Sequence, residues 1–503
     1  MTPTPPPPPR RFRLLRWALL LAALALAGCC GPSAFLWTRA WLRDRPAVEP
    51  VPPGFADDAS RLSRTPVAEV WPVPADPVQA EAQLRDLLRR AHEKKLGVSV
   101  AGARHSMGGH TIAPDGVVID MLPFNRLELD EEKNLLRAGA GARWAEVVPF
   151  LDARGLSVAV MQSNNDFSVG GSISVNCHGW QHDRPPIAST VESFRLMTAD
   201  GTVHRCSRTE NAELFAHALG GYGLFGVILD AELRVVPNER YTPVSEVVPT
   251  EHYVERLRAA AGPDAGMVQG RLCVTPGEPF LREAILTVWR KAPCPPADIP
   301  PLTAAGFAGL RREVYRAQIG SDAGKAARWR VEKLVTKQLA GTFFSRNRLL
   351  NDPVAVYQER NPDRTDILHE YFVPPEQFEP FLARCREVIP RHGGDLLNVT
   401  VRTVAEDKDT ALRYADRDVV ALVMLFNQPR DPAADERAGA MTRELIDGAL
   451  ACGGRYYLPY RLHATREQFA AAYPQAGAFF ARKRQYDPAG VFRNKFSDAY
   501  GTR

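Results

Sequence analysis

The chain has 503 residues, more than one ordinary hydrophobic core accommodates, so we expect two domains or one large composite. Its 63 basic and 58 acidic residues leave a formal net charge of only +5, and no dense Lys/Arg tract occurs, so nucleic acid is not an expected partner. The eight cysteines form no C-x-x-C pair and no His/Cys cluster at zinc spacing, which argues against a metal site and against an essential disulfide framework.

Residues 1–43 are predicted to be a targeting segment, because four arginines precede an uncharged stretch from Trp17 to Trp37. That stretch is long enough to cross a hydrocarbon core of roughly 30 Å as a helix. Three interpretations stay open: an uncleaved membrane anchor, a lipoprotein signal with Cys29 of "LAGC" as the lipidated N-terminus, and a cleaved or chance apolar segment. The first two tether the protein to a membrane, expected to be a bacterial inner membrane with the body in the periplasm. Residues 44–65 follow as a proline-rich linker.

From about residue 66 the chain alternates helical patterns with short apolar runs. The stretch 76–97 is predicted to be a helix that ends near Gly97, with an apolar face that includes Val78, Ala82, Leu84, Leu87, Leu88 and Ala91. Two expected strands, "VSVAG" and "GVVIDM", then enclose the loop "AGARHSMGGH", and a further helix is expected from Arg143 to Ala153. Asp200-Gly201 joins two alternating segments as a hairpin within 191–206. This is α+β packing with short connections.

One glycine pattern, Gly221-x-Gly223-x-x-Gly226, satisfies the dinucleotide fingerprint G-x-G-x-x-G. That fingerprint requires a strand before it and a helix after it, so that the pyrophosphate meets a helix N-terminus. Here a predicted helix precedes the glycines and the predicted strand "VILDAELRVV" follows them. A Rossmann nicotinamide site is therefore not expected.

Glycine loops at 102–109, 170–179 and 220–226 are more informative together than singly. Glycine lets backbone N–H groups approach a phosphate without an intervening Cβ, and consecutive amides can form an anion-binding concavity. In the second loop, the hydroxyl groups of Ser172 and Ser174 could donate hydrogen bonds to a phosphate, and His178 could approach a ring. Any one loop alone would more often be a turn; three of them suggest a long cofactor that lies across a domain.

In their order, these segments resemble the FAD-binding domain of the vanillyl-alcohol-oxidase, or PCMH, type of flavoprotein. "VSVAGARHSMGGH" resembles the first pyrophosphate loop, "DFSVGGSISVNCHG" the second, and "GGYGLFGVI" the segment whose backbone faces the flavin. The resemblance implies a two-subdomain FAD-binding domain over 66–240, an α+β substrate domain over 241–455, and a segment 456–503 that packs back on the FAD domain. It implies FAD as the cofactor, bound by Ala101, Gly102, Ala103, Arg104, His105, Ser106, Gly170, Gly171, Ser172, Ser174, Cys177, His178, Gly179, Gly223, Gly226, Val227 and Ile228.

The first loop carries a narrower resemblance. "GARHS" is similar to the G-x-G-H-S of aldonolactone oxidases and cytokinin dehydrogenases, whose histidine bonds covalently to the flavin 8α-methyl group. His105 falls on that position, and Arg104 stands where the family has glycine. The subgroup with two covalent bonds has a cysteine before the "VGG" loop, where this chain has "VMQSNND". Cys177 is therefore expected to be a small packed thiol.

The C-terminal half resembles two groups within this type and departs from each at one position. "GGRYYLPYRLH" is similar to the end of the decaprenylphosphoryl-ribose oxidases, whose active-site lysine falls on Tyr460. "NVTVRTV" is similar to a strand of the alditol and aldonolactone oxidases, whose arginine near flavin N5 falls on Arg402 and whose glutamate falls on Thr400. Subfamily and substrate therefore stay open.

Four residues are the candidate catalytic groups. Arg402 would orient a substrate oxygen or stabilise negative charge on reduced flavin, because it is a permanent cation. Tyr460 would relay the hydroxyl proton, His178 would line the pocket, and Glu370 is a further candidate. The alternatives are an ion pair between Arg402 and a carboxylate such as that of Glu406, a half-buried aromatic role for Tyr460, and a solvated strand face for Glu370.

The resemblance implies an FAD-dependent oxidoreductase that oxidises a CH–OH group of a sugar-, aldonolactone- or lipid-linked polyol by hydride transfer to flavin, with O2 or a membrane or soluble carrier as acceptor. Flavin oxidation of an alcohol also needs a route for the hydroxyl proton, which the protein supplies. One alternative is a flavin-dependent reductase of a C=C bond with the same fold. Another is a flavin-fold protein without turnover that serves as a binding or scaffold protein, which the absent lysine and glutamate favour.

Overall fold

The computed structural model describes residues 38, 42–44, 47–182, 184–303 and 308–501. The predicted targeting segment lies outside the described residues except for residues 38 and 42–43. Within the described ranges, none of the helices combines the length and the apolar character that a bilayer crossing requires.

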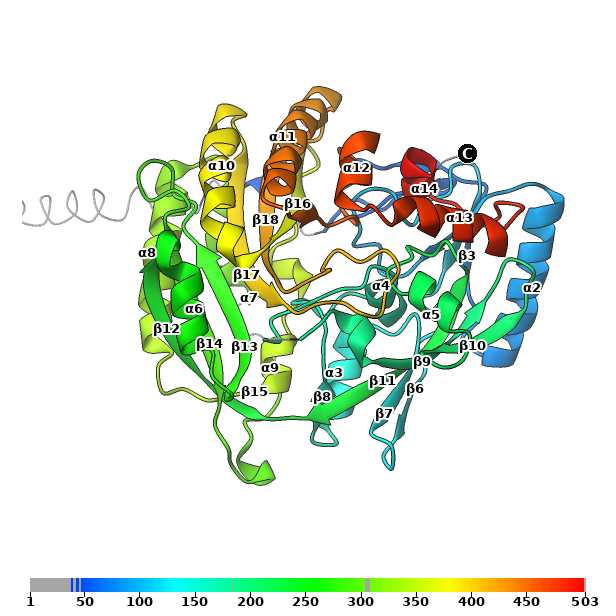
Figure 1. Cartoon of the computed structure of the whole chain (residues 1–503), viewed down its shortest axis with the longest axis horizontal. Helices are drawn as coiled ribbons and strands as arrows, with labels where there is room; N and C mark the ends of the chain where they lie inside the picture. Colours follow the sequence, from blue (N-terminus) through cyan, green and yellow to red (C-terminus); the bar gives the residue numbers. More distant parts are fainter. Residues whose placement is uncertain (1–37, 39–41, 45–46, 183, 304–307, 502–503) are drawn as a thin grey trace, which may run out of the picture.

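The N-terminal part of the described chain builds a small parallel sheet in the order β3–β5–β4. Its strands are β3 (Glu69–Pro72), β4 (Val98–Ala101) and β5 (Val117–Asp120). Strands β1 (Phe55–Ala56) and β2 (Thr65–Pro66) form a separate two-stranded ribbon, and Ala56 packs in one apolar cluster with Ala101 of β4 and Val118 of β5. The first glycine loop follows β4 directly, so the strand end positions that loop. Helix α2 (Pro77–Glu93) connects β3 to β4 (Figure 1).

Helix α2 begins where the sequence predicts and buries a different set of residues. Asp76 caps it by accepting the backbone N–H of Gln79, and Pro77 occupies the first turn, where its missing N–H costs nothing. Val78 is wrongly predicted to be on the apolar face, because its side chain is 78% exposed, and Ala82 is exposed too. At about 100° per residue, both lie opposite the buried stripe. That stripe is Ala80, Leu84, Leu87, Leu88 and Ala91.

A second, antiparallel sheet of six strands follows, in the order β10–β9–β11–β7–β6, with β8 also paired to β11. The predicted hairpin over 191–206 is confirmed, because β9 and β10 pair in antiparallel register on either side of Gly201, whose φ is +81°. The strands are β6 (Leu127–Asp130), β7 (Leu135–Gly139), β8 (Leu156–Val158), β9 (Val191–Met197), β10 (Val203–Ser207) and β11 (Val227–Pro237). The connecting helices are α3 (Trp144–Asp152), α4 (Val169–Ser174) and α5 (Ala212–Ala218).

The third glycine loop lies between α5 and β11, with a helix before it and a strand after it, as predicted. This order is the reverse of the Rossmann arrangement. The second glycine loop forms α4 and the turn that follows it.

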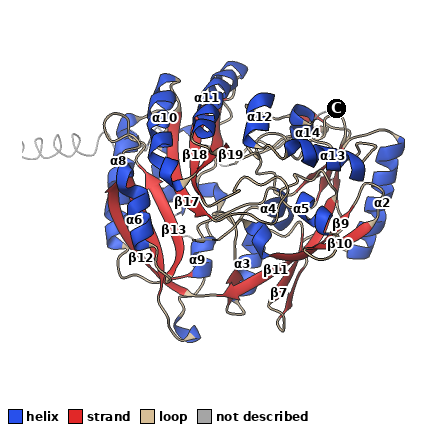
Figure 2. Cartoon of the chain, viewed as in Figure 1, coloured by secondary structure: helices blue, strands red, loops and turns tan. Residues whose placement is uncertain are grey.

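The next part of the chain builds a third sheet of eight antiparallel strands (Figure 2), in the order β15–β12–β14–β13–β17–β18–β16–β19. Its strands are β12 (Arg240–Pro249), β13 (Ala265–Leu272), β14 (Glu283–Lys291), β15 (Phe344–Ser345), β16 (Arg364–Val373), β17 (Asp395–Val404), β18 (Val419–Pro429) and β19 (Arg455–Tyr456). The helices of this part are α6 (Tyr253–Ala260), α7 (Ala308–Arg316), α8 (Asp322–Gln338), α9 (Arg346–Leu350), α10 (Phe378–Arg391) and α11 (Pro432–Ala451).

The two faces of the third sheet have different environments. Helices α6, α10 and α11 cover one face, where Phe378 of α10 meets the ring of Tyr253 and Phe381 meets Tyr371 of β16. Side chains alternate along a strand, so Asp366, Leu368 and Glu370 of β16 point to the other face. That face lines a cavity.

The C-terminal segment returns to the N-terminal part of the molecule. It contains α12 (Arg466–Ala472), α13 (Ala476–Tyr486) and α14 (Lys495–Tyr500). Val98 of β4 donates its N–H to Val491 O and accepts the N–H of Arg493, so this segment runs alongside the small parallel sheet.

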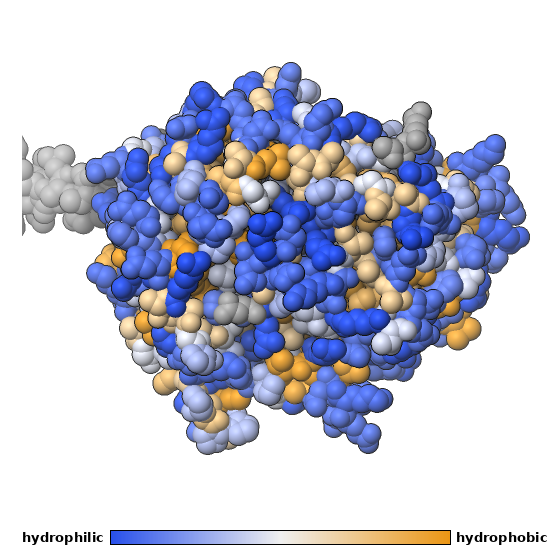
Figure 3. All heavy atoms as spheres, viewed as in Figure 1, coloured by the Kyte–Doolittle hydropathy of each residue, from blue (hydrophilic) through white to orange (hydrophobic). Residues whose placement is uncertain are grey.

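One hydrophobic cluster joins all these parts, from Val73 near the start of the body to Tyr500 in α14. The surface seen in Figure 3 is mostly hydrophilic, with apolar side chains in small scattered groups. Scattered apolar groups of this kind are normal on the surfaces of folded proteins.

Candidate active site

A cavity of about 570 Å³ lies between the glycine loops and the third sheet. All three glycine loops contribute to its wall, and strands β13, β16, β17 and β18 contribute the opposite side. Its volume is within the range of ligand and cofactor sites, about 300–1,000 Å³. Segments that are distant in the sequence therefore meet around one space.

The backbone of Arg104 explains why the related motif has glycine at this position. Arg104 has a φ of +56°, in the left-handed region that L-residues other than glycine seldom adopt. The loop thus keeps a glycine-type conformation although a larger residue occupies it. The guanidinium group points away from the cavity, and its Nη2 donates to Asp120 Oδ2 at 3.1 Å, at the end of β5.

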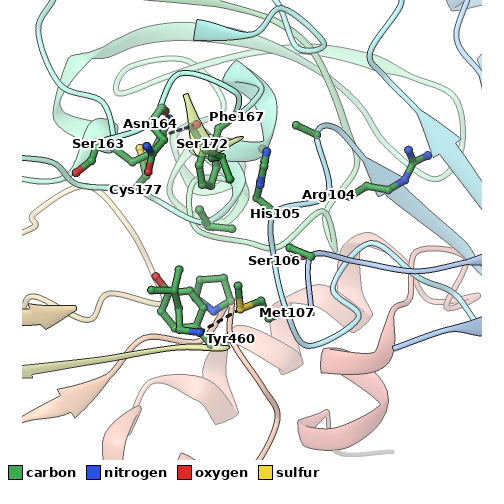
Figure 4. Close-up of a pocket in the computed structure, with 18 of the residues that line it drawn as sticks. Arg104, His105, Ser106, Met107, Ser163, Asn164, Phe167, Ser172, Cys177 and Tyr460 are labelled. Carbon is green, nitrogen blue, oxygen red and sulfur yellow. Dashed lines mark hydrogen bonds between the residues drawn. The ribbon is translucent and has the colours of Figure 1, made fainter. Parts of the chain in front are cut away.

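His105 lies at the cavity wall, stacked on the ring of Phe167 with 4.2 Å between ring centroids (Figure 4). Burial lowers the pKa of His105, and the nearby Asp166 opposes that shift only in part. The imidazole is therefore neutral near pH 7, and a neutral ring nitrogen retains a lone pair.

The first and second loops approach each other too closely for a side chain at Gly102. A Cβ there would lie 1.9 Å from Ser168 Oγ, an atom that also accepts the N–H of Ala103 at 3.3 Å. In the third loop, Gly223 and Gly226 have φ values of +72° and +151°, and a Cβ on Gly226 would meet Met197 O at 2.4 Å. The glycines thus allow close contact between loops and the required backbone conformations.

Most residues predicted to bind the cofactor line this cavity. Those that do are Gly102, Ala103, Arg104, His105, Ser106, Gly170, Gly171, Ser172, Ser174, Cys177, His178, Gly223, Gly226 and Ile228. Ala101, Gly179 and Val227 do not line it. Ala101 packs into a small apolar cluster with Ile112 and Val118, Val227 is fully buried in the main core, and Gly179 is closely packed against Met161 O.

The structure corrects the expected role of the Ser172 hydroxyl group. Ser172 Oγ donates to Gln162 Oε1 at 2.8 Å and accepts the indole N–H of Trp144 at 2.9 Å. Its single proton is therefore used within the protein, and its backbone N–H is used as well, because it donates to Ser168 O at 2.9 Å. The neighbouring Cys177 is 4% exposed, and burial raises the pKa of its thiol to about 12, so it is a protonated, packed thiol.

Three of the four candidate catalytic side chains form one hydrogen-bonded group. His178 Nε2 lies 2.5 Å from Glu370 Oε1, and the Tyr460 hydroxyl donates to Glu370 Oε2 at 3.1 Å. Glu370 is 3% exposed, so the alternative of a solvated strand face is wrong. The predicted candidates on α4–β9, β16 and the C-terminal segment are thus brought together.

The charges in this group decide its protonation. Burial raises the pKa of Glu370, but His178, the Arg402 guanidinium and the Tyr460 hydroxyl together outweigh it, so the net pKa is lowered. Burial, followed by the Glu370 charge, raises the pKa of Tyr460 well above its ordinary value. At neutral pH the group therefore holds a carboxylate and a neutral phenol.

The Glu370 carboxylate also determines the form of His178. A carboxylate only accepts hydrogen bonds, so His178 must carry its proton on Nε2 to make the 2.5 Å contact. The other nitrogen, Nδ1, is buried and has no hydrogen-bond partner among the described residues. Nδ1 is therefore the ring position at which His178 can exchange a proton with a bound group.

Arg402 completes the group from β17. Its Nη1 donates to His178 O at 3.2 Å and its Nη2 donates to Ser163 Oγ at 2.6 Å. The alternative ion pair with Glu406 is wrong, because the Glu406 carboxylate lies 3.4 Å from Lys408 instead. Among the described residues, Arg402 thus donates its hydrogen bonds to neutral acceptors at the cavity wall.

Sequence reasoning missed several cavity residues, among them Ser163, Phe167, Trp180 and Arg271. Ser163 lies in "VMQSNND", a stretch with no periodicity that suggests a role, and its contact to Arg402 spans 239 positions. Arg271 lies on an ordinary strand. Only the tertiary structure places either residue at the site.

The residues around the cavity fit a long polar cofactor. Ser106 Oγ, Thr111 Oγ1 and Trp180 Nε1 line it and are buried without a hydrogen-bond partner in the described chain. Buried polar atoms are normally satisfied, so these atoms point to a bound polar group. Within the same ranges, no group of three or more His, Cys, Asp or Glu side chains is placed to hold a metal ion.

Comparison with known families agrees with this geometry. Residues 77–207 match the FAD binding domain family, which includes the first two glycine loops and the hairpin. The chain therefore contains an FAD-binding domain of the PCMH type, and FAD is its cofactor.

Individual relatives include enzymes with different substrates. Over 156 residues the chain is 35% identical to L-gulonolactone oxidase of Mus musculus, covering 31% of this chain and 35% of that protein. It is 32% identical over 162 residues to decaprenylphosphoryl-beta-D-ribose oxidase of Mycolicibacterium smegmatis, covering 32% and 35%. It is 28% identical over 239 residues to cytokinin dehydrogenase 2 of Oryza sativa subsp. japonica, covering 44% and 42%. The matches to the first two span about a third of each relative's length.

Proposed function

We propose that this protein is an FAD-dependent oxidoreductase that oxidises a CH–OH group of a sugar-, lactone- or lipid-linked polyol. Bound FAD supplies the acceptor for two electrons. The observation that carries the proposal is the buried group His178–Glu370–Tyr460 beside Arg402, on the wall of the cavity that the glycine loops also line. Alcohol oxidation needs a proton acceptor, and this group contains one.

The alcohol proton would be taken at His178 Nδ1. Glu370 holds the opposite ring nitrogen protonated, and its negative charge balances the imidazolium that forms. Tyr460 stays a neutral phenol and keeps the carboxylate oriented through its 3.1 Å hydrogen bond. Arg402 supplies a fixed positive charge where negative charge develops, and its own hydrogen bonds go to neutral acceptors.

Anaerobic reduction tests the proposal directly. The purified, flavin-containing protein should lose its ~450 nm absorbance when mixed with a donor from a panel of aldonolactones, alditols and pentose derivatives. The His178→Asn variant should bind FAD and be reduced at least about 10²-fold more slowly by the same donor. Flavin that no polyol reduces would refute the alcohol-oxidising activity and would support a binding protein or a C=C reductase.

We further propose that His105 bonds covalently to the flavin. The support is its neutral imidazole at the cavity wall, within the motif "GARHS". Acid-precipitated wild-type protein should give a yellow pellet, and His105→Ala should give a colourless pellet with FAD in the supernatant. His110→Ala is a matched control, because His110 lies in the same loop and should leave the pellet yellow. A colourless wild-type pellet from a yellow solution would disprove the bond.

We also propose that the protein is held at a membrane by residues 1–43, on the support of the uncharged stretch from Trp17 to Trp37 after four arginines. The full-length protein should sediment with membranes and resist carbonate extraction. Release by carbonate would contradict an integral anchor. Globomycin, which blocks lipoprotein signal cleavage, separates the lipoprotein from the anchor, because only the lipoprotein should then migrate as a larger precursor.

A further inference from the structure

Two arginines that face the cavity have no carboxylate partner. Arg271 of β13 donates from Nη1 to Asn398 Oδ1 and, at 3.3 Å, to Thr400 Oγ1. Arg402 donates only to His178 O and Ser163 Oγ, and its Nε is buried without a partner. Within the described chain, neither guanidinium group forms an ion pair.

The two arginines belong to one polar surface of the third sheet. Arg271 pairs in register with Thr400, and Asn398, Thr400 and Arg402 are alternate residues of β17. Alternate residues of a strand share a face, so these side chains and Arg271 point into the same part of the cavity. We call Arg271, Asn398, Thr400 and Arg402 the polar face.

Carboxylates that line the cavity already form ion pairs or hydrogen bonds with other side chains. Asp352 pairs with Arg311 and Arg348, Asp366 pairs with Arg316, and Glu370 contacts His178. A third arginine near the polar face, Arg328, is neutralised by Glu332 at 2.7 Å while it donates to Asn398. Arg271 and Arg402 therefore differ from Arg311, Arg316 and Arg328, each of which pairs with a carboxylate.

Two like charges on one partly buried surface repel each other and have lost part of their hydration. Hydrogen bonds to neutral acceptors offset only part of this repulsion and of the lost hydration. An anionic group of a ligand, placed between the two guanidinium forks, would offset both charges and could accept hydrogen bonds from each.

We propose that Arg271 and Arg402 bind an oxyanion of the substrate, a carboxylate or a phosphate ester, so that the alcohol oxidised belongs to a sugar acid or a sugar phosphate. This inference rests on the proposed function, because it specifies the substrate class of the same cavity. It assigns Arg271 a role in binding and specificity. Because residue 400 is a threonine, the position opposite Arg271 on β17 carries no carboxylate.

Isothermal titration calorimetry of the full-length, flavin-containing protein tests this with three probes: inorganic phosphate, D-gluconate and neutral D-sorbitol. The wild type should bind at least one anion more tightly than sorbitol. Arg271→Gln should weaken that anion's binding about tenfold or more and change sorbitol binding less than twofold. Phosphate and gluconate together distinguish a phosphate ester from a carboxylate.

Two further variants show whether a loss of anion binding comes from misfolding or from the loss of Arg271. Arg290→Gln is the matched control, because Arg290 lies on β14 and pairs with Asp264 near the surface, so its anion affinity should equal that of the wild type. Thr400→Glu keeps both arginines and adds a carboxylate opposite Arg271, so it should weaken anion binding as Arg271→Gln does.

Several results would overturn the inference. They are a wild type that binds neither anion, equal anion affinity in wild type and Arg271→Gln, and an equal loss of anion and sorbitol affinity in Arg271→Gln. None of these depends on turnover, so failure of this inference is distinct from failure of the proposed function, which would appear as flavin that no donor reduces.

Discussion

At the scale of single residues, the site depends on how one buried carboxylate is compensated. Glu370 is almost fully buried, and such a carboxylate would normally take up a proton. Three neighbours prevent this: the imidazole of His178, the hydroxyl of Tyr460 and the charge of Arg402. The resulting carboxylate keeps a proton on Nε2 of His178, and the proposed role of Nδ1 as the base depends on this contact.

Replacement of this carboxylate by an amide gives a direct prediction. Glu370→Gln keeps the shape but removes the charge that holds His178 protonated on Nε2, so kcat should fall by about 10²-fold or more. Tyr460→Phe removes only one hydrogen bond to the carboxylate and should lower kcat about tenfold. Stopped-flow reduction of the flavin measures both. A Glu370→Gln enzyme with wild-type kcat would exclude this group from the proton transfer.

Arg104 gives a second prediction at this scale. Glycine adopts the observed φ of +56° without strain, so Arg104→Gly should keep its FAD content and change the unfolding free energy by no more than about 1 kcal/mol. Arg104→Val places a β-branched residue in the left-handed region and should destabilise the protein by about 1–2 kcal/mol. The FAD-to-protein ratio and urea unfolding check this. Loss of FAD from Arg104→Gly would show that the side chain itself is required.

At the scale of elements, the glycine loops are positioned by the strands and helices that flank them. The first follows β4, the second forms α4 and its following turn, and the third precedes β11. Each loop therefore begins or ends at a regular element in the core. The loops meet one another through contacts that exclude a Cβ, as between Gly102 and Ser168.

Two glycines of the third loop allow the stability cost of a left-handed backbone to be distinguished from the cost of a steric clash. At Gly223 a Cβ would meet only Val100, at 3.6 Å, so Gly223→Ala should cost about 1 kcal/mol for the left-handed φ alone. At Gly226 a Cβ would lie 2.4 Å from the Met197 carbonyl oxygen, which belongs to the neighbouring strand and cannot rotate away. Gly226→Ala should therefore cost clearly more, about 2 kcal/mol or above, and lower the FAD content. Equal losses in urea unfolding would contradict this distinction.

At the scale of the whole molecule, the packing of β16 between the cavity and α11 affects acid stability. His369 lies on the face opposite Glu370, and burial, followed by the charge of His463, lowers its pKa to about 3. Burial likewise lowers the pKa of His110 to about 3. Both residues fold as neutral imidazoles but take up a proton below their ordinary pKa of about 6.5 when the chain is unfolded.

The sign of the pH dependence follows from linkage. Between about pH 6.5 and 3 the unfolded chain binds more protons at these two sites, so their stabilising contribution is complete above pH 6.5 and is lost as the pH falls toward 3. Each histidine contributes a slope of about 1.4 kcal/mol per pH unit. His369→Gln should reduce the slope of the unfolding free energy by that amount between pH 5 and 6, and His92→Gln, at an exposed site on α2, should not. Parallel slopes in His369→Gln and wild type would show that His369 is not buried as a neutral ring.

The sequence by itself determined the local features of this protein. Helix start signals, the Asp200-Gly201 hairpin and the three glycine loops depend on residues that are neighbours in the chain, so their patterns survive without a structure. The order of those loops sufficed to predict FAD as the cofactor. Val78 was placed on the wrong face of its helix, because the sequence does not show which side of the helix packs against the rest of the protein.

Only the tertiary structure decided which side chains act together. His178 and Glu370 are 192 positions apart, and Ser163 and Arg402 are 239 apart, so no local pattern can indicate their contacts. Whether Glu370 was solvated or buried could not be decided from β16 alone, because a strand exposes two faces and the neighbouring layer determines which is covered. Burial then changed its chemistry, since the same carboxylate in water would not orient a histidine. The cofactor is thus encoded locally, whereas the contact between His178 and Glu370 and the position of Arg271 without a carboxylate partner in the described chain arise only because distant segments pack around one cavity.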